Sequence, residues 1–199
     1  VYCMPEDMSF QPDPKLLKAD ELRSLAASFS RLGFRKIRFT GGEPTLREDI
    51  VTIVEEVSRL PNIQTVAMTT NAIRLKSLAR PLAKAGLKRV NISVDTLKPD
   101  TFKKLTRWGR IEDVWEGIDA AEQAGLEIKL NAVIIRGVND DSDILELARL
   151  TIDHPWQVRF IEMMPFGEVA EFQTLFQVDE AILQKTLREN YGSLEPMYG

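Results

Sequence analysis

The chain has 199 residues, of which 44% are hydrophobic and 28% are charged, and its formal net charge is −4. This length and apolar content suffice for one domain with a sizeable core, which excludes disordered and fibrous proteins. No apolar run approaches the about 20 residues that span a bilayer, and a signal peptide is not evident, so we expect a soluble, cytoplasmic protein. The acidic balance argues against nucleic-acid partners, and any bound anion needs a local cluster of cations.

Cysteine and histidine occur once each. Cys3 cannot form an internal disulfide, and His154 alone supports neither a multi-histidine zinc site nor a Ser-His-Asp relay. The chain begins at Val1 without an initiator methionine and stops at Gly199 after a helical segment. We therefore expect a piece of a longer protein that is cut at both ends.

Apolar residues recur alternately at helical and at strand spacing along the chain. Five strands, each preceded by a helix, are typical of a parallel α/β fold, and no linker divides the chain, so we predict a single domain, 1–199. The predicted elements, in chain order, are a helix at 20–31, a strand at 36–39, a helix at 47–60, a strand at 65–69, a helix at 75–85, a strand at 89–94, helices at 100–105 and 111–124, a strand at 127–134, a helix at 142–152, a strand at 157–163 and a helix at 179–189.

Every predicted strand has one apolar face and one face with polar groups, whereas parallel strands that are covered on both sides normally read as continuous apolar runs. In a full or partial (β/α) barrel, the polar faces would line a lumen that opens at the carboxyl ends of the strands. The polar sets are Lys36, Arg38 and Thr40; Thr65, Ala67 and Thr69; Asn91, Ser93 and Asp95; Lys129 and Asn131; and Arg159 with Ile161. Lys36 could equally lie at a strand end in water.

Three cations on these faces, Arg38, Lys129 and Arg159, predict an anionic ligand in the lumen. The turn Gly41-Gly42-Glu43-Pro44 follows the first strand, and its paired glycines let a ligand approach the backbone while Glu43 can accept from an ammonium group. A plain tight turn fits the same residues.

Seven segments together resemble a known family along nearly the whole chain. They occur in this order: 2–6 (YCMPE), 38–47 (RFTGGEPTLR), 69–71 (TTN), 91–97 (NISVDTL), 129–133 (KLNAV), 136–140 (RGVND) and 159–165 (RFIEMMP). The ordered set is similar to the radical S-adenosylmethionine (SAM) GTP 3',8-cyclases, which carry out the first step of molybdenum cofactor biosynthesis. Gly-Gly-Glu-Pro is shared by many radical SAM enzymes, and the remaining segments are more specific.

This resemblance implies a partial (β/α)6 TIM-like barrel without its first strand and C-terminal segment, which should leave an exposed sheet edge and fold poorly alone. In the family, a Cys-x3-Cys-x2-Cys loop holds a [4Fe-4S] cluster and leaves one iron open for S-adenosyl-L-methionine. Cys3 matches the third of these cysteines, and a lone cysteine is otherwise most often a small buried hydrophobe.

The resemblance also implies roles for single residues. S-adenosylmethionine would be positioned by Tyr2, Gly42, Glu43, Ser93 and Met164. GTP would contact Arg38, Thr69, Lys129 and Arg159. The implied product is (8S)-3',8-cyclo-7,8-dihydroguanosine 5'-triphosphate, and no side chain is needed as a separate base in the first step. A homodimer and a functional link to cyclic pyranopterin monophosphate synthase are further implications.

The chain departs from the family in two respects. Ala72 follows Asn71 where the family has glycine, and the family's second three-cysteine cluster and Gly-Gly end are absent from these residues. Three alternatives stay open: a radical SAM enzyme with another substrate, a barrel scaffold without a cluster, and an aldolase-type barrel with Lys129 as a Schiff-base amine. The last leaves the Cys3 loop and the glycine turn unexplained.

Overall fold

A computed structural model describes residues 16–163 and 175–196, and its centre is one parallel sheet. The strands are β1 (Lys36–Phe39), β2 (Thr65–Thr70), β3 (Leu87–Ser93), β4 (Glu127–Ile134) and β5 (Gln157–Glu162). They lie side by side in chain order and every neighbouring pair is parallel. The predicted parallel α/β fold is confirmed.

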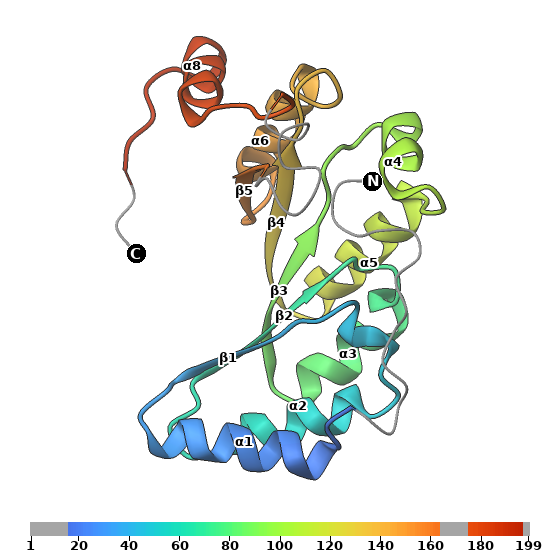
Figure 1. Cartoon of the computed structure of the whole chain (residues 1–199), viewed down its shortest axis with the longest axis vertical. Coiled ribbons are helices and arrows are strands. Elements are labelled where there is room, and N and C mark those ends of the chain that lie inside the picture. Colours follow the sequence, from blue (N-terminus) through green and yellow to red (C-terminus); the bar gives the residue numbers. More distant parts are fainter. Residues whose placement is uncertain (1–15, 164–174, 197–199) are drawn as a thin grey trace.

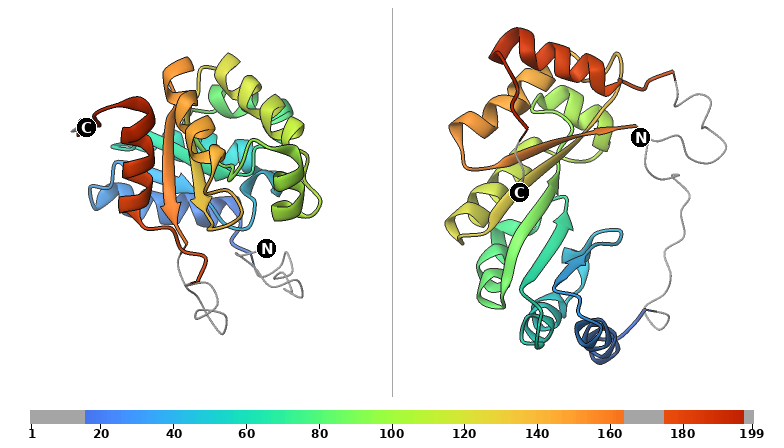
Figure 2. Two further views of the ribbon diagram at one scale, coloured as in Figure 1. Left: turned by 90° about the horizontal axis from the view of Figure 1, so that it is seen from above. Right: turned by 90° about the vertical axis from the view of Figure 1, so that its left-hand side faces the viewer.

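The helices connect successive strands. They are α1 (Ala19–Arg31), the 3-10 turn η2 (Pro44–Leu46), α2 (Ile50–Ser58), α3 (Leu75–Lys84), α4 (Pro99–Thr106), α5 (Ile111–Gln123), α6 (Ser142–Asp153) and α8 (Glu180–Tyr191). The sheet curves, and α2, α3 and α5 lie along its outer side (Figure 1), as in a partial TIM-like barrel. The view from above and the side view (Figure 2) show the same succession of strands with α8 beside α6.

Several predicted boundaries differ from the structure, and the largest difference is at the start of the second helix. We expected the second helix to begin at residue 47, but Arg47 has an extended backbone (ψ 126°), and the α-helix begins at Ile50. The Arg47 guanidinium donates to both carboxylate oxygens of Asp49 at 2.8 Å. Pro44 instead starts a 3-10 turn, which Glu43 caps and which separates the Gly-Gly pair from α2.

The core lies between the outer face of the sheet and the helices. Side chains that point outward from the three central strands are buried there, against apolar residues of α2, α3 and α5. The strand residues Val66, Met68, Val90, Ile92, Leu130, Ala132 and Ile134 are at most 2% exposed. Burial of apolar surface contributes about 25 cal/mol per Å², so this layer holds the sheet and helices together. The opposite face of the sheet is the polar one.

Close backbone packing sets the loop that follows β2. A Cβ at Gly117 of α5 would lie 2.2 Å from the carbonyl oxygen of Ala72, so α5 can approach this loop only with glycine there. Ala72 itself is fully buried and has φ +67°, a left-handed conformation that glycine adopts more readily than alanine. The family's glycine at this position therefore has a conformational reason.

The strand β1 forms one edge of the described sheet. Apolar side chains near this edge are exposed: Leu25 (47%), Phe29 (40%), Leu32 (76%) and Phe34 (54%). The predicted exposed edge is thus present within residues 16–163 and 175–196. Among these residues, no helix is long and apolar enough to cross a membrane.

Candidate cofactor and anion site on the polar face

The strand register aligns the predicted site residues in rows across the polar face. Thr69, Asn91 and Lys129 are successive Cα partners on β2, β3 and β4. Ser93, Asn131 and Arg159 form the next row toward the carboxyl ends of the strands. Because side chains alternate along a strand, partners in one row share a face. Thr69 and Lys129 therefore share the polar face, with Asn91 between them, and Ser93 shares its row with Arg159.

Arg38 lies in a lower row, with Ala67 and Arg89 as its successive partners. We define the cation cluster as Arg38, Arg89, Lys129 and Arg159. Burial lowers the pKa of Lys129, and the positive charges of Arg89, Arg159 and Arg38 lower it further, while Glu127 opposes them. All four cations lie on the same face of the sheet, in three successive rows.

The cation cluster carries more positive charge than its surroundings balance. Within residues 16–163 and 175–196, no hydrogen bond or ion pair joins Arg38, Lys129 or Arg159 to another side chain. Such an arrangement in an acidic protein favours a bound polyanion, and guanidinium forks match the geometry of phosphate oxygens.

Glu43 is held at the carboxyl ends of β1 and β2 by four donors. Its Oε1 accepts from the Thr45 N–H at 3.0 Å, the Thr45 hydroxyl at 2.6 Å and the Thr70 hydroxyl at 2.8 Å. Its Oε2 accepts from the Asn71 N–H at 2.8 Å. We call Glu43, Thr45, Thr70 and Asn71 the turn cluster. The carboxylate joins two strand ends, and Oε2 can accept one more donor.

The glycines of the turn leave the backbone open beside the turn cluster. Gly41 has φ +148°, and a Cβ built on it would meet no atom within 4 Å. Gly41 and Gly42 are both exposed. A ligand can therefore reach the backbone next to the Glu43 carboxylate, which a plain buried turn would not permit.

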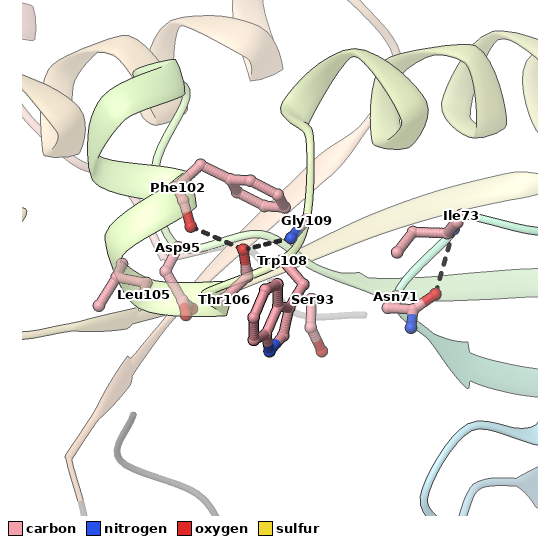
Figure 3. A pocket seen from close by; sticks show the side chains of 9 residues that line it. All are labelled: Asn71, Ile73, Ser93, Asp95, Phe102, Leu105, Thr106, Trp108 and Gly109. Carbon is pink, nitrogen blue, oxygen red and sulfur yellow. Dashed lines mark hydrogen bonds between the residues drawn. The ribbon is translucent and has the colours of Figure 1, made fainter.

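A cavity of about 370 Å³ opens at the carboxyl ends of β2 and β3 (Figure 3). Ser93 lines it, and the Trp108 side chain there is 93% exposed. The lining residues are Asn71, Ile73, Ser93, Asp95, Phe102, Leu105, Thr106, Trp108 and Gly109. The predicted cofactor residue Ser93 therefore lies in a hollow that also touches the turn cluster through Asn71.

Three functional features were not predicted from the sequence. Arg89 belongs to the cation cluster. Asn91 is buried and donates from Nδ2 to the Met68 carbonyl at 3.2 Å. Asn131 Oδ1 is buried without a hydrogen-bond partner among the described residues. The alternation of polar residues does mark Asn91 and Asn131 as polar-face residues, but only the contacts show what each one does.

Asn139, the asparagine of the RGVND segment, has a structural role. Asn139 is fully buried, and its Nδ2 donates to the carbonyls of Asp95 at 2.6 Å and Val133 at 2.9 Å. Its Oδ1 accepts from the Ile135 N–H at 2.7 Å. This amide ties the loop after β4 to the end of β3, next to the cavity.

Three predicted site residues, Tyr2, Cys3 and Met164, lie outside the described residues. Within the described ranges, no group of three or more His, Cys, Asp or Glu side chains could hold a metal ion. The described part of the site thus consists of the turn cluster, the cavity and the cation cluster.

The sequence model of the radical SAM superfamily matches residues 1–150, and the chain belongs to this superfamily. It is 41% identical over 198 residues to the GTP 3',8-cyclase of Pelotomaculum thermopropionicum, which covers 98% of this chain and 61% of the relative. It is 48% identical over 169 residues to the GTP 3',8-cyclase of Listeria monocytogenes serovar 1/2a, covering 84% of this chain and 50% of the relative. The chain thus spans between about half and three fifths of these relatives.

Solved structures support the fold. Native anSMEcpe with bound AdoMet aligns with a TM-score of 0.70 at 16% identity, covering 94% of this chain and 54% of that one. Streptococcus suis SuiB bound to the precursor peptide SuiA aligns with a TM-score of 0.68 at 21% identity, covering 92% and 40%. At these identities, the likeness concerns the fold alone.

Proposed function

We propose that the protein containing this chain is a GTP 3',8-cyclase that forms (8S)-3',8-cyclo-7,8-dihydroguanosine 5'-triphosphate. The observation that carries the proposal is the cation cluster, which lies on the polar face below the glycine turn. The relatives named GTP 3',8-cyclase, 41% and 48% identical to this chain, support the same substrate. A triphosphate supplies the concentrated negative charge that these side chains lack.

The residues present fit the amino acid part of S-adenosylmethionine. The open backbone at Gly41 and Gly42 admits a ligand, and Glu43 Oε2 retains capacity for an ammonium donor. When bound, the [4Fe-4S] cluster would donate an electron that cleaves the sulfonium, and the adenosyl group would abstract a hydrogen atom from the substrate ribose. In the proposal, Cys3 is one of the cluster ligands, and Tyr2 and Met164 contact the cofactor.

The chain's own residues would orient the substrate along the strands. Lys129, Arg38 and Arg159 hold the triphosphate, with Thr69 in the same row as Lys129. Asn131 Oδ1 is a buried acceptor between Ser93 and Arg159, and a ribose hydroxyl would satisfy it. The triphosphate would lie deep in the lumen, and the ribose would face the cofactor at the strand ends.

Placement is the protein's main contribution to such chemistry. Hydrogen atom abstraction needs no proton acceptor, so no side chain of the described site has to act as a base in that step. The apolar walls of the cavity, Ile73 and Phe102 among them, would keep water from the reacting atoms. A single domain over residues 1–199, a homodimer, a cytoplasmic location and a functional link to cyclic pyranopterin monophosphate synthase belong to the same proposal and rest on the resemblance.

The test uses the full-length protein after anaerobic reconstitution with iron and sulfide. We expect conversion of GTP to the cyclic product, with 5'-deoxyadenosine and methionine formed from S-adenosylmethionine, as measured by liquid chromatography and mass spectrometry. The Cys3→Ala variant should lose the part of the visible absorbance that belongs to the cluster held by Cys3, together with cleavage of S-adenosylmethionine and all product. Cleavage of S-adenosylmethionine without a GTP-derived product would indicate another substrate, and absence of a cluster in the reconstituted wild type would indicate a scaffold.

A further inference from the structure

Arg89 is a member of the cation cluster to which the family resemblance assigns no role. It is the third residue of β3, and its Cα partners are Ala67 on β2 and Glu127 on β4. The guanidinium donates from Nε to Glu127 Oε2 at 2.7 Å, and its Nη2 contacts the same oxygen. The side chain therefore lies across the polar face toward β4.

The residue between Arg38 and Arg89 is small. Ala67 pairs with Arg38 on one side and with Arg89 on the other. Neighbouring strands lie about 4.8 Å apart, so β1 and β3 are separated by about 10 Å. Ala67 is only 7% exposed, and the Arg89 guanidinium is bonded to Glu127 on the opposite side of β3. Lys129, two residues after Glu127 on β4, is therefore closer to the Arg89 guanidinium than Arg38 is.

The hydrogen bonds to Glu127 use only some of the donors of the Arg89 guanidinium. A guanidinium has five N–H donors, and Glu127 engages only the Nε and Nη2 edge. The Glu127 side chain is 63% exposed and that of Arg89 is 29% exposed, so the pair contributes little to stability as a surface salt bridge. Its clearer effect is to hold the guanidinium in place, with Nη1 left available.

The positive charge of Arg89 also lowers the pKa of the neighbouring Lys129 ammonium group. Among the charges that lower the pKa of Lys129, that of Arg89 is the largest, ahead of Arg159 and Arg38. A purely structural cross-strand pair would not need to face a second, unneutralised cation. An anion between Arg89 and Lys129 would remove this repulsion.

We propose that Arg89 is a further phosphate-binding residue, which with Lys129 holds the terminal phosphate of the substrate on the β3–β4 side of the polar face, while Glu127 orients its guanidinium. The inference rests on the proposed function and deepens it, because it assigns recognition of the phosphate chain to a residue outside the family segments. Discrimination between GTP and GMP then depends on Arg89.

The test measures binding of GTP and GMP to reconstituted full-length protein by titration calorimetry. Arg89→Gln should weaken GTP binding about tenfold to hundredfold, the range for loss of a charge-assisted hydrogen bond, and leave GMP binding nearly unchanged. Arg89→Lys should recover part of the loss. The control is Arg80→Gln, an exposed arginine on α3 that removes the same charge from the outer surface.

A second variant keeps the test decisive if Arg89→Gln does not fold. Glu127→Gln leaves the charge of Arg89 in place but removes the exposed carboxylate that holds its guanidinium, and it should change GTP binding more than GMP binding. Equal losses for GTP and GMP in both variants, or an equal loss in Arg80→Gln, would overturn the inference. If the wild type binds GTP and the variants bind it with the same affinity, this inference alone is refuted. If the wild type does not bind GTP, the proposed function is refuted as well.

Discussion

The turn cluster and the cation cluster lie on the same polar face, but they differ in how far the protein satisfies its own polar groups. The Glu43 carboxylate accepts four internal hydrogen bonds. In the cation cluster, only Arg89 has a carboxylate partner among the described residues. The internal hydrogen bonds of the turn cluster are therefore formed before any ligand binds, with Oε2 open to one more donor, whereas the charge of the cation cluster is not balanced.

This difference separates a site that the protein's own hydrogen bonds hold in place from a site whose charge only a ligand can balance. A carboxylate with several fixed donors stabilises the fold and holds the open glycine backbone in one shape. Like charges brought together without counterions cost stability, a cost that natural proteins accept at sites where the ligand supplies the missing charge. Substitutions in the cation cluster should consequently weaken GTP binding and raise stability. Substitutions in the turn cluster should lower stability and change GTP binding little.

Lys129→Met should produce the largest effect. Loss of a charge-assisted hydrogen bond to phosphate costs about 1.5–3 kcal/mol, so GTP affinity should fall about tenfold to hundredfold. The ligand-free protein should become more stable, because the repulsion from Arg89, Arg159 and Arg38 is removed. Calorimetry and thermal unfolding of the full-length protein measure the two effects, with Lys129→Arg as the charge-preserving control. A lower Tm of Lys129→Met together with an unchanged GTP affinity would contradict the claim that the cation cluster is a binding site with unbalanced charge.

Glu43→Gln should act in the opposite sense on stability. The amide of glutamine replaces one acceptor oxygen by a donor, which leaves the Asn71 N–H or the threonine hydroxyls without a partner. We expect the free energy of unfolding to fall by about 1–3 kcal/mol and GTP affinity to change little. Chemical denaturation of the full-length protein measures the first quantity. The matched control Thr45→Val removes the hydroxyl donor of Thr45 and keeps its backbone N–H donor, so it should cost less; an equal cost would mean that the carboxylate is not the centre of the cluster.

The ionisation of Lys129 provides a pH test of the cation cluster. Its pKa is lowered in the ligand-free protein, and a bound anion would raise it again. Affinity should be constant below the lowered pKa and fall as the pH rises through it, with uptake of a fraction of a proton on binding. The ligand-free fold should gain stability over the same alkaline range, because a lysine whose pKa is lower in the folded state destabilises that state only while charged. Calorimetry in buffers of different ionisation enthalpy detects the uptake, and Lys129→Met should abolish it.

Ala72→Gly should give the smallest change. Ala72 has φ +67°, so glycine relieves a strained backbone but also loses a buried methyl group and gains chain entropy when unfolded. We expect the free energy of unfolding to change by less than about 1 kcal/mol, with no change in GTP affinity. Denaturation curves of the full-length variant measure it. A large loss of stability would show that packing against Gly117, and not the backbone conformation, determines this position.

Much of the fold follows from local patterns in the sequence. Alternation along each strand placed Arg38, Lys129 and Arg159 on one face, and the register confirms that face. This works because side-chain direction in a strand depends on the chain's own geometry. The boundaries of the second helix and of β3 were less predictable, because the extended backbone at Arg47 and the register irregularity between Val66 and Ala67 depend on neighbouring elements.

The sequence by itself determined the fold class, the polar face and most of its cations, because these depend on short-range periodicity. Only the tertiary structure decided which polar groups meet. Arg89 belongs to the cation cluster because β3 starts at Leu87 and its register sets Arg89 between Ala67 and Glu127. Glu43 becomes a four-donor acceptor because β2 brings Thr70 and Asn71 to it across 27 and 28 residues. Such contacts between distant segments arise from packing of whole elements, which no local pattern encodes.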